Sequence, residues 1–428
     1  MTQYICSKMF TDINMKFPYN SVKNCCKTKD IHLEIDELKN NKNIFIENTD
    51  YLKRKAIMLF ENRLPDACDY CLKLEPNNWF RSSYNVYHDK KIIFTNDEKK
   101  EMYKGDKGRL FEFVLSSVCD LKCVYCGPKD STSWAKETNQ NKNVGNEEWK
   151  NLILDQFINY LKNKDFTDDP CYYFSFSGGE PTYNPETIIL LEKLINYVPS
   201  HKLRLQFSSN LNTKKNIFDK YVDLINKHSN IIWQFQCSID CLDKQFEAIR
   251  YGAKWDRVFN NLKILLSLDN VQVRLSPTLN IFSLPTLKEY LQFFVKLFNE
   301  YKKPLNKRIG FNMVMEPGLS IQNLPKHYVK YIDNALEYCI LEKLDYAENL
   351  KRIRNIIGNS ITEHTYSEIV HCIQYFENKR PEINWYETFP HLYDVLKTLN
   401  PNMTIIDYQE HFIPPNARFH KNTICLPS

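Results

Sequence analysis

The sequence predicts an α/β fold in which parallel strands alternate with helices and curl into a full or partial barrel. Six short runs are apolar, or alternate between apolar and polar residues as strands do. Helical patterns separate most of these runs, and such repeats are typical of parallel sheets with right-handed crossovers. The expected strands span residues 110–116, 171–177, 202–209, 231–239, 271–279 and 308–315. The expected helices span residues 147–163, 185–197, 213–228, 255–268 and 285–301.

Three of the expected strands alternate strictly between apolar and polar residues. The polar members include Arg204, Gln206, Gln234, Gln236, Gln272 and Arg274. Successive side chains of a strand point to opposite faces, so each strand has an apolar face for the helices and a polar face for the barrel lumen. An antiparallel sheet with one face in solvent gives the same alternation, but the intervening helices favour a lumen that holds water or a polar substrate.

Composition indicates an ordinary globular protein. The chain has 428 residues, which suits two or three domains, with 43% hydrophobic and 25% charged residues. A net charge of +5 does not favour a nucleic-acid partner. Neither an apolar run of membrane-spanning length nor a secretory signal is visible. Because the fourteen cysteines are partly clustered at metal-ligand spacings, we expect a reducing, cytoplasmic location rather than a disulfide framework.

Cys119, Cys123 and Cys126 follow the first expected strand with the spacing C-x3-C-x2-C. Three thiolates this close can hold three irons of a cubane cluster and leave the fourth iron open to a ligand from outside the protein. Zinc sites more often use paired C-x2-C units with a distant second half. A second motif, Ser-Gly-Gly-Glu-Pro at residues 177–181, follows the second expected strand.

Together these two motifs resemble the radical S-adenosylmethionine (SAM) enzyme family. The resemblance implies an open, partial (β/α)6 barrel of the TIM type over residues 101–320. It implies a SAM-binding [4Fe–4S] cluster on Cys119, Cys123 and Cys126 at the carboxyl ends of the strands, with SAM as cofactor. An electron donor such as flavodoxin or ferredoxin is implied as a partner. Residues 321–428 are expected to be largely helical.

The resemblance places part of the SAM site beside the two motifs. Tyr125 lies where the family usually has an aromatic residue next to the adenine; a loop aromatic packed on the barrel is the alternative. Gly178 and Gly179 have no side chains, so the backbone can approach a ligand closely. Glu180 and the backbone around it would meet the methionine ammonium, and a plain turn is the alternative for this motif.

Two later strand ends complete the expected SAM site. Ser208 and Asn210 resemble the family's ribose-contacting segment, and Ser238 and Asp240 resemble the serine and aspartate that end its next strand. By the same resemblance, Ser238 and Arg250 would bind the methionine carboxylate, for which the planar fork of arginine is suited. Strand-end capping or a surface ion pair is the alternative for these polar side chains.

A second set of cysteines lies within the first hundred residues: Cys6, Cys25, Cys26, Cys68 and Cys71. Four thiolates would close either a zinc site or a second four-iron cluster, and sequence alone does not separate these metals. The order of the cysteines resembles the auxiliary-cluster segments called SPASM or twitch domains. We therefore expect residues 1–100 to form an auxiliary cluster domain, with either Cys25 or Cys26 as the fourth ligand.

The sequence thus predicts a radical SAM enzyme that acts on a small-molecule or peptide substrate. The two arginines among the polar strand residues favour a polar ligand such as a peptide, sugar or nucleotide, because buried arginines need partners. The alternative is a zinc-stabilised binding or regulatory protein with metal at both cysteine sets and no SAM chemistry.

Overall fold

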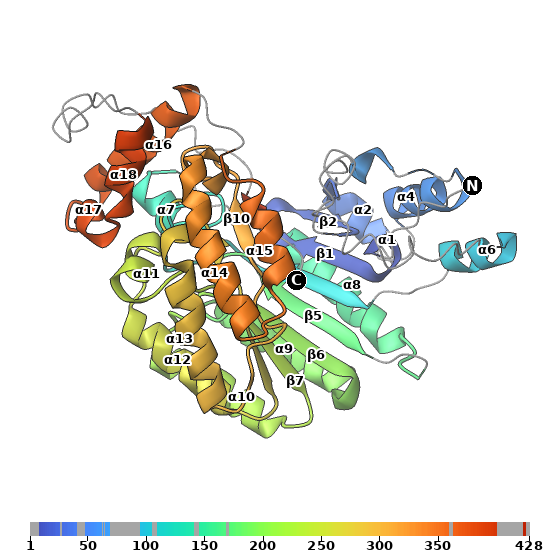
Figure 1. Ribbon diagram of the computed structural model, residues 1–428. Helices are drawn as coiled ribbons and strands as arrows, with labels where there is room; N and C mark the ends of the chain where they lie inside the picture. Colours follow the sequence, from blue (N-terminus) through green and yellow to red (C-terminus); the bar gives the residue numbers. More distant parts are fainter. Residues whose placement is uncertain are drawn as a thin grey trace.

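The computed structural model of the protein is an α/β molecule built around one large sheet (Figure 1). The structure describes residues 8–25, 28–40, 48–61, 63, 65–68, 95–104, 109–140, 145–167, 171–358, 363–399 and 423–424. In this part of the chain, no helix is long and apolar enough to cross a membrane.

The main sheet has eight strands in the order β3-β2-β1-β4-β5-β6-β7-β8, and a small sheet has the order β11-β10-β9. From β1 to β8 along this order every neighbouring pair is parallel, whereas β2 and β3 pair antiparallel at one edge. The strands are β1 (Asp12–Lys16), β2 (Ser21–Lys23), β3 (Ile31–His32), β4 (Leu110–Val114), β5 (Tyr172–Ser177), β6 (Leu203–Ser209), β7 (Ile232–Cys237), β8 (Val271–Leu275), β9 (Thr278–Leu279), β10 (Asn312–Val314) and β11 (Thr423–Ile424).

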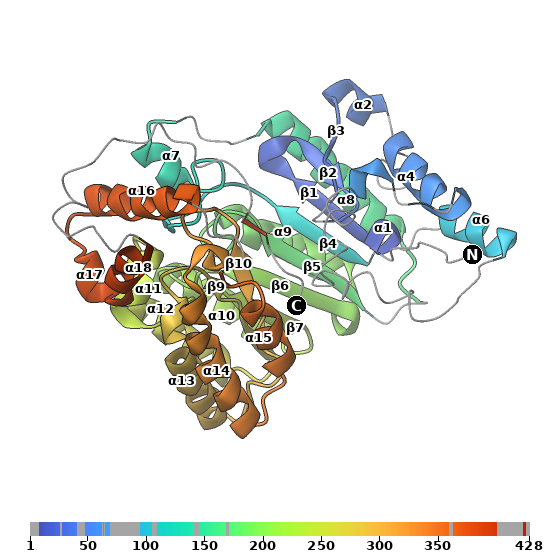
Figure 2. The same cartoon turned by 45° about the horizontal axis from the view of Figure 1, so that its top comes forward.

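Helices lie along one side of this sheet and at its two ends (Figures 1 and 2). The helices are α1 (Lys8–Thr11), α2 (Ile35–Asn40), α4 (Thr49–Phe60), α6 (Asn96–Lys104), α7 (Thr132–Glu137), α8 (Glu147–Asn163), α9 (Pro185–Tyr197), α10 (Lys215–Lys227), α11 (Asp243–Ile249), α12 (Trp255–Ser267), α13 (Leu287–Glu300), α14 (Val329–Leu341), α15 (Ala347–Arg354), α16 (Glu363–Lys379), α17 (Trp385–Thr388) and α18 (His391–Leu399). Figure 2 shows α16, α17 and α18 grouped at the end of the molecule opposite to α4 and α6.

The predicted α/β fold is confirmed, and the helices between the strands begin where local signals place them. The side chain of Asn146 accepts a bond from the backbone N–H of Trp149 and caps α8. Asn184 caps α9 in the same way, and Pro185 occupies its first turn. Helices α8 and α9 accordingly have the bounds that the sequence predicts.

The predicted strand over residues 271–279 is divided in two. β8 ends at Leu275, and β9 begins at Thr278 and pairs with β10 in the small sheet. Pro277 lies in the gap, where its missing N–H and fixed φ interrupt the ladder. A single parallel bridge between Leu275 and Ile309 links β8 to the chain that leads into β10.

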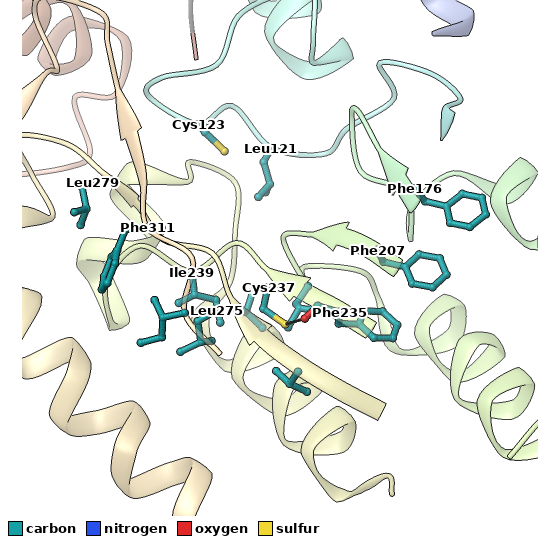
Figure 3. Close-up of a cluster of buried hydrophobic side chains, with 14 of the residues drawn as sticks. Leu121, Cys123, Phe176, Phe207, Phe235, Cys237, Ile239, Leu275, Leu279 and Phe311 are labelled. Atoms are coloured by element: carbon teal, nitrogen blue, oxygen red, sulfur yellow. Dashed lines mark hydrogen bonds between the residues drawn. The ribbon is translucent and has the colours of Figure 1, made fainter. Parts of the chain in front are cut away.

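The outer face of the sheet carries an aromatic core. Phe113, Phe176, Phe207 and Phe235 stand opposite one another in the register of four neighbouring strands, and consecutive rings are stacked with centroids 5.0–5.4 Å apart. Figure 3 shows the last three projecting from their strands in the same direction, towards the helices. Phe157 of α8 packs edge-on against Phe113, so the helix covers this row.

The inner face carries the polar side chains, and the predicted alternation is confirmed. Gln206 donates to Ser175 Oγ at 3.1 Å, and Gln234 donates to Gln206 Oε1 at 3.0 Å, which forms a row across three strands. Arg274 stands opposite Gln236 in the register between β7 and β8, with the buried Val273 and Leu275 on either side of it in sequence. Arg274 therefore belongs to the inner face and not to the helix-covered one.

The N-terminal segment joins the barrel sheet, which the sequence did not indicate. β1 pairs in parallel with β4 over five residues, from Asp12 opposite Leu110 to Lys16 opposite Val114. This pairing covers the backbone edge that β4 would otherwise expose. The boundary near residue 100 between a cluster domain and the barrel stays a prediction.

Candidate active site

The loop between β4 and α7 carries the three cysteines at the carboxyl ends of the strands. The backbone N–H of Lys122 donates to the carbonyl of Tyr251 at 2.9 Å, which ties the loop to the segment after α11. The indole N–H of Trp134 in α7 donates to the carbonyl of Cys123 at 2.9 Å. Cys119 and Cys126 are half-buried and Cys123 is buried. Figure 3 shows Cys123 on this loop, near Leu121.

Hydrogen-bond donors point at two of the three sulfurs. Cys119 Sγ accepts from the backbone N–H of Leu121 at 3.5 Å and from the side-chain amide of Asn210 at 3.9 Å. Cys123 Sγ accepts from Nη1 of Arg250 at 3.8 Å. Burial raises the pKa of all three thiols, and the Arg250 charge opposes this rise at Cys123. Donors of this kind stabilise thiolates that ligate iron, and they tune the potential of a bound cluster.

The glycine pair after β5 is required by packing against the cysteine loop. Gly178 has φ +77° and Gly179 has φ +53°, the left-handed region that favours glycine. A Cβ on Gly178 would lie 2.3 Å from Val114 Cγ1, and one on Gly179 would lie 2.4 Å from the carbonyl oxygen of Val118. The turn needs both glycines whether or not a ligand is present, and their contact with SAM stays a prediction.

Glu180 is buried, and its carboxylate is held by donors from two strand ends. It accepts from the hydroxyl of Thr182 at 2.6 Å, the hydroxyl of Ser209 at 2.8 Å and the backbone N–H of Asn210 at 2.6 Å. The backbone N–H of Thr182 adds a fourth bond, at 3.0 Å. Burial raises the pKa of Glu180, and these donors oppose the rise. Glu180 thus fastens the turn after β5 to the end of β6; its contact with the methionine ammonium stays a prediction.

Asp240 holds two of the other predicted site residues, Arg250 and Tyr125. Its carboxylate accepts from Nε and Nη2 of Arg250 at 2.9 and 3.1 Å, from the Tyr125 hydroxyl at 2.6 Å and from the backbone N–H of Thr278 at 2.7 Å. The guanidinium carbon of Arg250 also lies 5.5 Å from the centre of the Tyr125 ring. Two nitrogens of Arg250 are used by Asp240, which leaves Nη1 directed at the sulfur of Cys123.

The remaining predicted residues lie at the same edge of the sheet. Ser208 donates to Gln236 Oε1 at 3.4 Å, and Ser238 follows β7 directly. Asn210 reaches the cysteine loop through Asp120 Oδ1, at 3.4 Å. Asp120 was not predicted, because its position between two cysteines carried no signal apart from theirs. The structure therefore brings all nine predicted SAM-site residues to the carboxyl ends of the strands, beside the three thiols.

Comparison with known proteins agrees with this arrangement. Residues 113–294 match the family model described as "Radical SAM superfamily". The chain carries a radical SAM domain. The predicted radical SAM domain is thereby confirmed for residues 113–294, whereas the radical SAM activity of the whole protein and the SPASM or twitch assignment stay predictions.

One curated protein and two solved structures are also similar to this chain. Molybdenum cofactor biosynthesis protein 1 of Dictyostelium discoideum is 25% identical over 222 residues, which are 48% of this chain and 32% of that protein. Two solved structures, a native and a tagged form of "anSMEcpe with bound AdoMet", are 18% and 17% identical, with TM-scores of 0.39 and 0.41. Each match covers 55% of this chain, and 62% and 59% of the respective structures. The chain spans about a third of its curated relative and about three fifths of these structures.

The residues of the radical SAM domain fit a [4Fe–4S] cluster with one open iron. Cys119, Cys123 and Cys126 present three thiols on one loop, and donors already point at two of their sulfurs. Within the described ranges, no three His, Cys, Asp or Glu side chains form a site for a single metal ion. A cubane does not need such a site, because each cysteine binds a different iron.

Two of the N-terminal cysteines can be placed, whereas Cys6, Cys26 and Cys71 lie outside the described residues. Cys25 and Cys68 are both buried. The backbone N–H of Lys29 donates to the carbonyl of Ala67 at 3.1 Å, which joins the two segments that carry these cysteines. A metal site shared by Cys25 and Cys68 requires that the segments carrying them lie next to each other.

The radical SAM domain is also held by a residue from the C-terminal helices that the sequence did not single out. Arg380, directly after α16, is 0% exposed and donates through Nη2 to the carbonyl of Lys122 at 2.6 Å. Its guanidinium carbon lies 5.2 Å from the Trp134 ring, 4.5 Å from the Tyr251 ring and 4.8 Å from the Phe376 ring. These contacts join the C-terminal helices to the residue next to Cys123.

We expect Arg380→Met to loosen the cysteine loop without unfolding the protein. Nε and Nη1 of Arg380 are buried without a hydrogen-bond partner in the described part of the chain. An apolar side chain at this position removes the free-energy cost of burying these unpaired groups. The bond to the Lys122 carbonyl is lost at the same time. Hydrogen exchange at residues 119–126 of the metal-free protein should therefore accelerate while the unfolding midpoint stays the same or rises. Lys379→Met, at an exposed neighbour, is the control, and equal exchange in both variants would contradict the role of Arg380.

Proposed function

We propose that the protein cleaves SAM reductively and uses the resulting 5′-deoxyadenosyl radical to abstract hydrogen from a polar substrate. The observation that carries this proposal is the loop with three thiols at the carboxyl edge of a matched radical SAM domain. When a [4Fe–4S] cluster is bound at Cys119, Cys123 and Cys126, its chemistry is the transfer of one electron to SAM, which breaks the sulfonium into methionine and the radical.

The protein's own residues would hold and orient these groups. Arg250 and Asn210 donate to cluster-binding sulfurs, and Asp240 keeps the Arg250 fork in place through two bonds. Glu180 fixes the glycine turn against the strand ends where SAM would lie. Tyr125 is held with its hydroxyl on Asp240, and its ring is the proposed contact of the adenine. Ser208, Ser238 and Arg250 are proposed contacts of the ribose and the methionine carboxylate.

The inner face of the barrel supports a polar substrate, such as a peptide, sugar or nucleotide. Its row of Ser175, Gln206 and Gln234 offers amide and hydroxyl groups to a ligand. An aliphatic ligand would bury these groups without new partners, which costs free energy. Small molecules and peptides are therefore proposed as substrates.

An auxiliary metal centre is proposed at Cys6, Cys68, Cys71 and one of Cys25 and Cys26. The support is the burial of Cys25 and Cys68 on joined segments, together with the C-x2-C pair formed by Cys68 and Cys71. A second [4Fe–4S] cluster would assist the substrate radical chemistry, and zinc would be structural. Flavodoxin or ferredoxin is the proposed electron donor. A reducing compartment such as the cytoplasm is the proposed location, because metal-ligating cysteines have to stay reduced.

Anaerobic reconstitution with iron and sulfide, followed by reductant and SAM, tests the proposal. We expect charge-transfer absorption of an iron–sulfur cluster in the visible range and formation of 5′-deoxyadenosine and methionine. A protein that holds zinc at both cysteine sets and forms no 5′-deoxyadenosine would instead be the zinc-stabilised binding protein.

Cys68→Ala is expected to remove the auxiliary metal and leave SAM cleavage intact. Metal ligation contributes to the folding of small units, so the first hundred residues should become more susceptible to protease. Metal and sulfide analysis together with limited proteolysis checks both effects. Cys339→Ala, at a buried thiol of α14, is the control for loss of a buried sulfur. Unchanged metal content in the Cys68 variant would contradict the auxiliary site.

A further inference from the structure

We propose that Arg380, a residue of the C-terminal helical region, raises the reduction potential of the cluster bound at the cysteine loop. Its buried positive charge acts from beside Cys123 and stabilises the reduced form of the cluster. This inference rests on the proposed function in one respect, since it takes an iron–sulfur cluster to be bound at the three cysteines. It goes beyond that function by giving the C-terminal helices a part in the electron transfer.

Arg380 contacts the cysteine loop at two points next to Cys123. Its Nη2 donates at 2.6 Å to the carbonyl of Lys122, the residue directly before Cys123. The indole N–H of Trp134 donates to the carbonyl of Cys123 at 2.9 Å, and the guanidinium carbon of Arg380 lies 5.2 Å from the centre of that indole. The guanidinium charge therefore lies beside one of the three cluster ligands.

The surroundings of Arg380 preserve the effect of its charge. The residue is 0% exposed, and the rings of Tyr251 and Phe376 lie 4.5 and 4.8 Å from its guanidinium carbon. Aromatic faces attract a cation but carry no net charge, so they hold the guanidinium without neutralising it. Salt screens a buried charge much less than an exposed one, so the field of Arg380 reaches the cysteine loop.

Arg250 and Arg380 both act on Cys123, but they differ in their own partners. Burial raises the pKa of the Cys123 thiol, and the charges of Arg250 and Arg380 oppose this rise. Arg250 is bound by Asp240 through two of its nitrogens, so replacing Arg250 would also leave a buried carboxylate without its partner. Arg380 binds a carbonyl and aromatic rings, so its replacement removes a positive charge and leaves no such carboxylate.

The carboxylates on the Arg380 side of the loop have partners of their own. Burial lowers the pKa of Arg380, and the charge of Glu137 opposes this effect. The ion pair of Glu137 is formed with Lys122, however, and Glu382 accepts from the hydroxyl of Tyr251. Neither of these bonds involves Arg380, so its substitution should change the charge beside the cluster by one.

Replacing Arg380 has two effects on the reduction potential, and they have opposite signs. Reduction adds one negative charge to a cluster, so a nearby positive charge favours the reduced form, and its loss lowers the potential. Loss of the bond to the Lys122 carbonyl would instead let water reach the loop. Water favours the more highly charged, reduced form and would raise the potential. The direction of the change therefore separates an electrostatic role of Arg380 from a structural one.

The test is a potentiometric titration of the reconstituted full-length protein without SAM, followed by electron paramagnetic resonance. The signal of the SAM-binding cluster is identified as the one that is missing from Cys123→Ala. In Arg380→Met, we expect the ratio of reduced to oxidised cluster at a given potential to fall about tenfold, which is about 59 mV for one electron. Arg380→Gln should shift in the same direction, whereas Arg380→Lys retains the charge and should titrate close to the parent.

Lys379→Gln is the control for the loss of one positive charge. Lys379 is the exposed neighbour of Arg380 in sequence, so solvent and salt screen its charge and the variant should titrate as the parent does. An unchanged or higher potential in Arg380→Met, or equal shifts in Arg380→Met and Arg380→Lys, would overturn the inference. Loss of the cluster from both neutral variants would also overturn it, because Arg380 would then have a structural role.

Formation of 5′-deoxyadenosine by the parent is measured separately from the potentials. A parent that holds the cluster but forms no 5′-deoxyadenosine would contradict the proposed function and leave the result on Arg380 to stand. A shift of the expected size and sign together with SAM cleavage would support both. A parent that holds no iron–sulfur cluster would overturn both.

Discussion

Alanine at Cys119, Cys123 or Cys126 is expected to remove the SAM-binding cluster and reduce 5′-deoxyadenosine formation to the level measured without protein. Each cysteine would bind a different iron, so two remaining thiolates do not hold the cluster with one iron open. Iron and sulfide content, visible absorption and single-turnover product formation should all fall together. The auxiliary centre should keep its metal in these variants, because its ligands lie on other segments.

Cys171→Ala is the matched control for the three cysteine variants. Cys171 is a half-buried free thiol directly before β5, at the opposite end of the strands from the cysteine loop. Its replacement should leave cluster content and SAM cleavage unchanged. If the three loop variants instead formed 5′-deoxyadenosine at the parent rate, the assignment of the loop would be wrong.

Asp240→Ala is expected to lower the free energy of unfolding by about 3–5 kcal/mol, because it leaves the buried charge of Arg250 without its partner. The side chains of Arg250 and Asp240 are 7% and 0% exposed, so water does not replace the lost carboxylate. The Tyr125 hydroxyl and the Thr278 N–H lose an acceptor at the same time. Urea unfolding of the metal-free protein measures the change, and SAM affinity of the reconstituted protein should also fall.

Asp219→Ala provides the comparison for Asp240. Asp219 forms an ion pair with Lys215 one helical turn away on α10, with side chains 44% and 82% exposed. Exposed pairs of this kind contribute about 0–1 kcal/mol, so the variant should unfold nearly as the parent does. Equal losses from the two substitutions would show that the Asp240 network does not stabilise the fold.

Local signals in the sequence account for much of the fold. The bounds of α8 and α9 follow from Asn146, Asn184 and Pro185, whose capping effects act within one turn. The alternation in β6, β7 and β8 predicted both faces of the sheet, because side chains of a strand switch sides at each residue. The spacing of the cysteines predicted the cluster loop, because these three residues are close in sequence.

The sequence did not predict features that depend on pairing between distant segments. Parallel pairing of β1 with β4 joins residues almost a hundred positions apart, and short strands of this kind have no local signature of their partner. Arg380 is another case, because a single arginine after a helix looks like an ordinary surface residue until the fold buries it beside Lys122 and Tyr251.

By itself, the sequence determined the α/β class, the cysteine loop, the glycine turn and the set of polar residues around them, because each of these features depends on residues that are close in sequence. Only the tertiary structure decided which partner each polar residue has. Glu180 is held by the Ser209 hydroxyl and the Asn210 N–H at the end of β6, and the Asp240 carboxylate accepts from Arg250, Tyr125 and Thr278. The strength of an interaction between charged groups depends on their distance and their burial, and both are set only when the chain folds.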